Sequence, residues 1–169
     1  GKAVAHRCLD GSGFRVVAEY DTPDWGPDKA QGRMEGQITA ITSGLGGVYA
    51  ANDGTAGGAI AARKGGGVAP LPPVTGQDAE LAGIQRVVSG DQAMTIYKAI
   101  KPQAEDAAKA ALALAAGQNP TSSTTVLGVP ATLLTPIAVT KANIKDTVVK
   151  DGIYKVSNLC TASFATACP

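Results

Sequence analysis

Four side chains suited to binding a neutral, hydroxyl-rich ligand follow one another in this sequence at similar spacings. They are Trp25, Asn52, Asp78 and Lys98, which lie 27, 26 and 20 residues apart. An aromatic ring can pack against the C–H face of a pyranose, and an amide donates and accepts hydrogen bonds at once. A carboxylate accepts from two hydroxyl hydrogens and an ammonium donates to hydroxyl or ring oxygens. Such charge-assisted hydrogen bonds are about twice as strong as neutral ones.

Each of the four residues also has a purely structural explanation. Asn52 and Asp78 are good helix N-caps, and capping alone explains either of them about as well as ligand binding does. Trp25 could be a loop residue folded onto the core, and a lone lysine such as Lys98 is more often solvated than functional. A residue of this kind follows each of four successive predicted strands, and this recurrence favours the binding interpretation. The neighbouring acids are interpreted as first-turn or loop residues: Asp24, Asp28 and Asp53.

The elements predicted around these residues alternate between strand and helix. Predicted strands occupy residues 14–19, 47–51, 73–76, 93–97 and 132–139. Predicted helices occupy residues 27–41, 52–64, 78–90 and 102–116. This alternation implies crossovers between parallel strands, and strands that are apolar on both faces imply helices on both sides of the sheet. The sequence therefore predicts an α/β fold, a three-layer αβα sandwich with a mainly parallel sheet. Ligands of such sheets bind at the carboxyl ends of the strands, where all four residues fall.

Composition excludes several classes of protein. Lys+Arg 15 against Asp+Glu 14 leaves a net charge of +1, so no electrostatic footprint for nucleic acid stands out. No apolar run reaches the roughly 18 residues of a membrane span. His6 is the only histidine, so a histidine-based triad or a multi-histidine metal site is not available within this chain. We expect no enzyme, no metal and no cofactor.

The three cysteines cannot all pair. Cys160 and Cys168 lie eight positions apart in a polar terminal stretch, where a loop-closing disulfide would fit an oxidising compartment. Two unpaired thiols in a frayed tail explain the same residues about equally well. Cys8 lies in a segment of alternating apolar residues and is interpreted as a small buried hydrophobe.

At these residues the sequence resembles the sugar-binding proteins of bacterial ABC importers, which have the type I periplasmic-binding-protein fold, and especially their xylose-binding-like branch. Four segments carry the resemblance: 22–31, 47–62, 72–98 and 131–152. The Asn-Asp-Gly stretch at 52–54 and the Gly-Gln-Asp turn at 76–78 occur widely among sugar binders. The tryptophan loop and the Thr-x-Tyr-Lys ending at 95–98 are narrower and typical of xylose-type binders.

This resemblance implies a role for each of the four residues. Trp25 matches the family's stacking tryptophan, Asn52 and Asp78 its hydroxyl-binding amide and carboxylate, and Lys98 its sugar-contacting lysine. The implied ligand is a monosaccharide, either xylose or another aldose such as glucose, and the implied partner is an ABC permease of the membrane. The implied location is periplasmic or extracellular, with a lipid anchor in organisms that have one membrane. Two alternatives stay open: a sugar-sensing domain of a regulator or chemoreceptor and, less favoured, a small α/β enzyme.

The resemblance also implies that this chain is one lobe of a two-lobed protein. Residues 1–169 are assigned to the C-terminal lobe, 14–98 and 132–139 to its sheet core with helices, and 153–169 to a tail beyond the family pattern. The family's chain crosses back near Lys98, so the helix within 99–120 would pack on the N-terminal lobe. That lobe, its second aromatic and arginine ligands, and the first strand and helix of the C-terminal lobe have no counterpart in this sequence.

Overall fold

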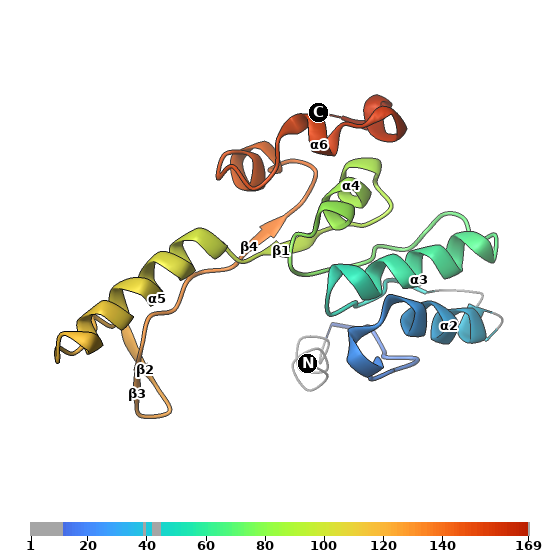
Figure 1. The fold of residues 1–169 in the computed structure, drawn as a ribbon. Coiled ribbons are helices and arrows are strands. Elements are labelled where there is room, and N and C mark those ends of the chain that lie inside the picture. The colour runs from blue at the N-terminus through green and yellow to red at the C-terminus, as the bar shows by residue number, and fades with distance from the viewer. Residues whose placement is uncertain (1–11, 39, 42–44, 169) are drawn as a thin grey trace. The chain divides into compact units, whose positions relative to one another are not determined.

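The computed structural model describes residues 12–38, 40–41 and 45–168. It divides the chain into a first unit, residues 1–97 with 138–169, and a second unit, residues 98–137. Figure 1 labels the helices and strands of both units. The interpretations of His6 and Cys8 concern residues outside the described part of the chain.

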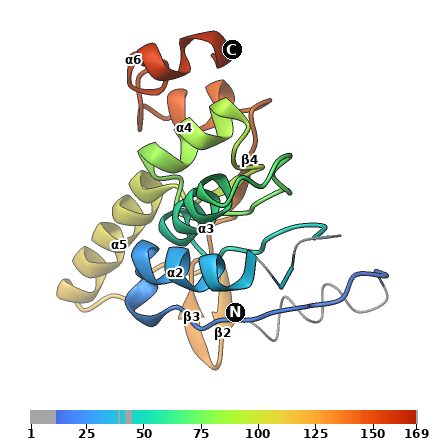
Figure 2. The same cartoon turned by 90° about the vertical axis from the view of Figure 1, so that its right-hand side faces the viewer.

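Two helices packed side by side form one part of the first unit. Helix α2 spans Pro27–Ile38 and α3 spans Asp53–Gly65 (Figures 1 and 2). Proline is favoured at the first helical position because its ring sets φ and its missing N–H would have no partner there. The two helices approach closely at Gly58, where a Cβ atom would overlap the carbonyl oxygen of Pro27. Both helices agree with the sequence prediction.

The extended segments between the helices form less regular sheet than the sequence predicted. Val48 and Val74 make an isolated parallel bridge, in which the amide of Val48 donates to the carbonyl of Pro73 at 2.8 Å. Strand β1 (Thr95–Tyr97) pairs with β4 (Ile137–Val139), whose last two residues belong to the first unit. A core cluster joins Ala56 and Ile60 of α3 to Ala50 and Val74, with Val48 and Leu71 packed against it.

All five predicted strands are longer than the segments that the described structure pairs. Residues 47–51 and 73–76 contribute only the Val48–Val74 bridge, and residues 93–97 contribute only β1. Residues 14–19 are extended but form no strand within the described residues, and Phe14 and Val17 are exposed. A strand needs a neighbour to complete its backbone hydrogen bonds, and residues 14–19 pair with no strand in the described part of the chain, although the Phe14 ring lies beside Gly46. The strand predicted at 132–139 is confined to its last three residues, β4. The mainly parallel sheet is thus seen only as the Val48–Val74 bridge and short strands.

Helix α4 and the C-terminal segment form the rest of the first unit. Helix α4 spans Leu81–Ser89, buries Ile84, Val87 and Val88, and ends at Gly90, whose φ of 85° is left-handed. The C-terminal segment contains a π-helical turn η2 (Lys145–Val149), a short helix α6 (Val156–Leu159) and a 3-10 segment η3 (Ala162–Ala167). Both α6 and η3 contact α4.

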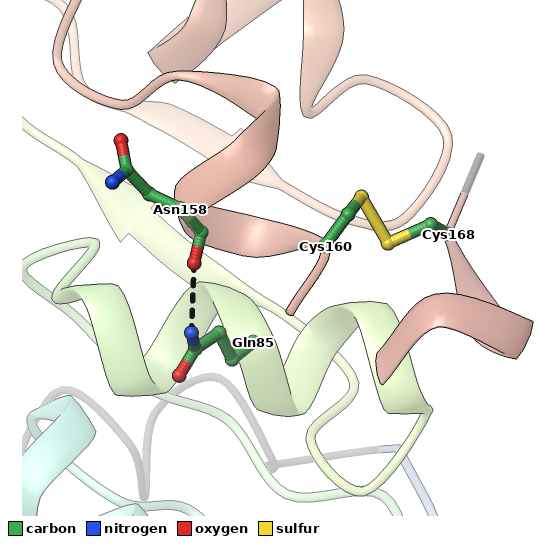
Figure 3. The surroundings of a disulfide bond; sticks show 4 residues. All are labelled: Gln85, Asn158, Cys160 and Cys168. Carbon is green, nitrogen blue, oxygen red and sulfur yellow. Dashed lines mark hydrogen bonds between the residues drawn. A yellow bond between two sulfur atoms is a disulfide. The ribbon is translucent and has the colours of Figure 1, made fainter. Parts of the chain in front are cut away.

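The C-terminal tail is therefore folded and not frayed. The Gln85 side chain of α4 donates from Nε2 to the Asn158 carbonyl at 2.9 Å, and Leu159 is buried. Cys160 and Cys168 form a disulfide with a Cα–Cα distance of 5.8 Å, which is the paired form of the two alternatives left open by the sequence. Figure 3 shows the disulfide beside the contact between Gln85 and Asn158.

The second unit consists of a helix and a hairpin. Helix α5 spans Ile100–Ala115, close to the predicted 102–116. Strands β2 (Thr124–Val126) and β3 (Val129–Ala131) pair antiparallel, with Val126 opposite Val129. Within the described structure none of the side chains of α5 is buried. Its packing on another lobe stays a prediction.

Candidate functional site

Trp25 is presented by a tight turn immediately before α2. It ends the 3-10 turn η1 (Pro23–Trp25), and both Asp24 and Trp25 have left-handed backbone, with φ of 52° and 56°. The Lys29 ammonium binds the Asp24 carboxylate at 2.8 Å and so ties the turn to the first turn of α2. Trp25 is 59% exposed, so its side chain is not folded onto the core.

Asn52 caps helix α3. Its Oδ1 accepts from the backbone amide of Thr55 at 2.9 Å and from the Thr55 hydroxyl at 2.6 Å. Among the residues that the structure describes, no hydrogen bond uses the Nδ2 group of Asn52. Capping and ligand binding are therefore compatible, because one end of the amide holds the helix while the other can donate to a hydroxyl oxygen.

Asp78 is not a helix cap, which corrects one of the two structural explanations. Helix α4 begins at Leu81, and the residue before it is Glu80. Asp78 instead lies in a turn with φ of 95°, followed by Ala79 with φ of 50°. Its backbone amide donates to the Ile96 carbonyl at 2.9 Å, while its side chain is exposed. Such backbone is costly for residues other than glycine and persists only where the surroundings hold it in place.

Three of the four predicted residues lie on neighbouring segments of the first unit: Trp25, Asn52 and Asp78. A Cβ atom at Gly54 would lie 3.3 Å from Cγ of Pro27, so the starts of α2 and α3 adjoin. The amide of Asp53 donates to the Gln77 carbonyl at 2.8 Å, which joins the start of α3 to the turn before α4. Lys98 is exposed and directly follows β1, as the first residue of the second unit.

A buried polar network lies beneath these segments and was missed by the sequence prediction. Asp53, interpreted above as a first-turn acid, does lie in the first turn of α3 but is fully buried. Its carboxylate accepts from Gln92, Thr95 and the backbone amide of Glu80. The only sequence pattern that marks Asp53 is its place directly after a capping asparagine. An exposed acid in the first turn of a helix has the same pattern, so the sequence does not distinguish a buried Asp53 from an exposed one.

Arg86 balances the charge of this network. Its Nη2 donates to the Asp53 backbone carbonyl at 2.6 Å and its Nε to Oε1 of Gln92 at 3.0 Å. Burial lowers the pKa of Arg86, while the carboxylates of Asp53, Glu80 and Asp91 oppose that shift. Burial raises the pKa of the Glu80 carboxyl, and the negative charges of Asp53 and Asp78 add to the rise. The carboxylates of Asp53, Asp78 and Glu80 thus lie close enough together to interact, and Arg86 is hydrogen-bonded to the backbone of Asp53.

Of the hollows in the described part of the first unit, two open ones are lined by none of the four predicted residues. One of about 480 Å³ lies at the C-terminal ends of α2 and α3, beside Ile38 and Gly66. The other, of about 420 Å³, lies between α2, α3 and the start of α4, beside Asp53 and Gly54. In the described part of the chain no cluster of three or more His, Cys, Asp or Glu is arranged to hold a metal ion. No helix there has the length and apolarity to cross a membrane.

Curated relatives match most of this chain. The D-xylose-binding periplasmic protein of Escherichia coli K12 is 44% identical over 155 residues, which are 89% of this chain and 47% of that protein. The protein of the same name from Haemophilus influenzae is 42% identical over 145 residues, 83% of this chain and 44% of that protein. The chain therefore spans about half the length of these relatives.

Solved structures of similar fold also match most of this chain over about half of their own length. An ABC transporter solute-binding protein from Clostridium phytofermentans with bound β-D-glucose superposes with a TM-score of 0.79 at 27% identity, covering 93% of this chain and 53% of that one. A carbohydrate transporter solute-binding protein from Chloroflexus aurantiacus in complex with D-glucose superposes with a TM-score of 0.72 at 34% identity, covering 80% of this chain and 42% of that one.

A family model described as a periplasmic binding protein domain matches residues 2–119. Its members are binding proteins and not enzymes, in agreement with the expectation drawn from the sequence. By this match and the curated relatives, the chain belongs to the periplasmic binding protein family and has the fold of that family.

Proposed function

We propose that this chain is the C-terminal lobe of a solute-binding protein that captures a monosaccharide reversibly and delivers it to an ABC importer. The observation that carries the proposal is the grouping of an exposed indole, an amide with a usable donor and an exposed carboxylate on adjoining segments. The most similar curated proteins cited above are named for D-xylose binding, so xylose or a related aldose is the proposed ligand.

Each residue has a distinct part in the proposed binding. The Trp25 ring stacks on the C–H face of the sugar, and Nδ2 of Asn52 donates to a hydroxyl oxygen. The Asp78 carboxylate accepts hydroxyl hydrogens, and the Lys98 ammonium donates to a hydroxyl or to the ring oxygen. Charge-assisted bonds of this kind gain strength once water is excluded, because the local dielectric constant falls.

Exclusion of water is the part of the proposed mechanism that needs a second lobe. Trp25 is 59% exposed in this chain, so a sugar stacked on its ring would stay in contact with water unless a second lobe covered it. In the proposed protein two lobes close over the sugar, and the closed form is the one that the permease recognises. The lobe itself is proposed to be a three-layer αβα sandwich. The proposed location is periplasmic or extracellular, which also suits the disulfide between Cys160 and Cys168.

Calorimetry on the natural protein that contains this chain tests the proposal, with D-xylose, D-glucose and D-ribose as ligands. Asp78→Asn should weaken binding at least about 10-fold, since a lost charge-assisted hydrogen bond is worth about 1.5–3 kcal/mol. Trp25→Ala should also weaken binding, because it removes the ring that stacks on the sugar. Tyr20→Ala and Asp91→Asn are the matched controls, because they remove an exposed aromatic ring and a carboxylate paired with Lys64. Absence of sugar binding by the unaltered protein, or unchanged affinity in Asp78→Asn, would refute the proposal.

A further inference from the structure

Asp53 connects the segments that carry the proposed sugar contacts. It is fully buried, and its carboxylate accepts three hydrogen bonds from three different parts of the chain. Gln92 donates from Nε2 to Oδ1 at 2.7 Å, Thr95 donates from Oγ1 to Oδ2 at 3.0 Å, and the amide of Glu80 donates to Oδ2 at 2.9 Å. One carboxylate thus joins the start of α3, the turn before α4 and the start of β1.

Asp53 itself and two of its three partners lie within three residues of a proposed sugar contact, and Gln92 lies six residues before Lys98. Asn52 immediately precedes Asp53, Glu80 follows Asp78 by two residues, and Thr95 precedes Lys98 by three. The amide of Asp53 also donates to the Gln77 carbonyl at 2.8 Å, and the Thr95 hydroxyl accepts from the amide of Ala79 at 3.2 Å. The turn that holds Asp78 is therefore bound on both sides to Asp53 and to its partner Thr95.

Arg86 fixes the orientation of the Gln92 amide. A guanidinium can only donate, so Oε1 of Gln92 must face Nε of Arg86. The Nε2 group of Gln92 then faces Asp53, where only an acceptor satisfies it. An asparagine at position 53 keeps the size of the side chain but places one NH₂ group against a donor, whichever way its amide is turned.

Two glycines pack directly against the Asp53 carboxylate. Gly76 and Gly83 both lie against it, and a Cβ atom at either position would overlap a carboxylate oxygen of Asp53. Interiors packed this closely transmit small displacements to their neighbours. A change at Asp53 should therefore move the turn of Asp78 relative to the start of α3.

On the basis of the proposed function, we infer that Asp53 is a positioning residue of the sugar site. It contacts no sugar itself, and it acts by holding Asn52 and Asp78 at the separation that one sugar ring requires. A purely structural role would also make Asp53 important for stability. The two roles differ in whether the effect of Asp53 depends on the presence of Asn52.

The experiment is a double-mutant cycle in the natural protein that contains this chain. Asp53→Asn should weaken binding of D-xylose or D-glucose roughly 10- to 100-fold at a temperature well below its melting temperature. Asn52→Ala should then cost much less affinity in the Asp53→Asn background than in the unaltered protein, because Asn52 is already displaced. Additive losses would overturn the inference. Asp28→Asn, which removes an exposed first-turn acid from α2, is the matched control and should bind within about twofold of the unaltered protein.

A second pair of variants covers the case in which Asp53→Asn does not fold. Thr95→Val removes the hydroxyl that Asp53 accepts from and should weaken binding, whereas Thr95→Ser keeps it and should not. Equal affinities in both variants would overturn the inference.

Hydrogen exchange separates failure of the inference from failure of the proposed function. The backbone amides of residues 78, 79 and 80 donate to the Ile96 carbonyl in β1, to the Thr95 hydroxyl and to the Asp53 carboxylate, respectively. Asp53→Asn or Thr95→Val should therefore speed the exchange of these amides, even without any sugar. If the unaltered protein binds no sugar, the proposed function fails, and exchange alone decides whether Asp53 holds the turn. Unchanged exchange at residues 78–80 would overturn the inference in either case.

Discussion

Replacing Gly58 by alanine tests how the turn of Trp25 is positioned. Gly58 lies in the middle of α3, where the start of α2 packs against it. A Cβ atom there would overlap the Pro27 carbonyl oxygen and approach the Gln31 amide nitrogen to 3.0 Å. Both are backbone atoms that cannot rotate away, so α2 must shift. Trp25 precedes Pro27 by two residues and must shift with it.

The expected magnitude follows from two opposing effects. An alanine in a helix interior is favoured over glycine by about 0.8–1.0 kcal/mol. Overpacking of a close contact costs about 1–3 kcal/mol. Gly32→Ala is the matched control, since no described atom lies within 4 Å of a Cβ at that position on α2. Gly32→Ala should therefore raise stability by the propensity gain alone, and Gly58→Ala should fall below it by about 1–3 kcal/mol.

Thermal unfolding of the two variants measures this difference. One kcal/mol corresponds to about 2–4 °C for a domain of 150–250 residues, so their melting temperatures should differ by roughly 2–12 °C. Gly58→Ala should also weaken sugar binding, because the indole moves, whereas Gly32→Ala should not. Equal stabilisation by the two substitutions would refute the close packing of α2 on α3 at Gly58.

Two further predictions concern the C-terminal half of the first unit. The double variant Cys160→Ser/Cys168→Ser should lower the free energy of unfolding by about 2.5 kcal/mol, because it removes the constraint that the disulfide places on the unfolded chain. Its melting temperature should be insensitive to dithiothreitol, and equal stability of the oxidised and reduced unaltered protein would contradict this prediction. Burial alone would raise the pKa of Asp91, but hydrogen bonds from Lys64 and Ser89 outweigh it and lower that pKa. The contribution of Asp91 to folding stability is thus present above its ordinary pKa of 3.8 and is lost as the pH falls through its lower folded-state pKa. Urea unfolding should therefore show that Asp91→Asn is less stable than the unaltered protein at pH 7, by less than about 1 kcal/mol, and that this difference vanishes in acid. A difference that grows in acid would contradict that sign.

The helices could be predicted from the sequence because their end signals are local. Pro27 at the first position of α2, Asn52 before α3 and Gly90 after α4 each act within one helical turn. The strands could not be delimited in the same way. Their bounds depend on pairing with distant segments, as Val48 pairs with Val74, and residues 14–19 have no such partner among the described residues.

The same distinction separates the predicted site residues from the network below them. Asn52 was recognised by its type and by its place before a helix. The burial of Asp53 depends on Gln92 and Thr95, which lie 39 and 42 residues further along the chain. Nothing in the spacing of these residues indicates a shared hydrogen-bond network. Capping was one of two explanations of Asp78 because a carboxylate before an apolar helical segment often caps the helix, but here a turn of left-handed backbone intervenes.

The packing of Gly76 and Gly83 against Asp53 has a consequence for how sequences of this kind can change. A methyl group at either glycine would overlap the carboxylate, so a substitution there must displace the Asp53 side chain. A smaller residue at 53 would make space but leave the donors of Gln92 and Thr95 without an acceptor. These positions can therefore diverge only together, through simultaneous or compensating replacements. Related sequences should vary at 53, 76 and 83 as one correlated group.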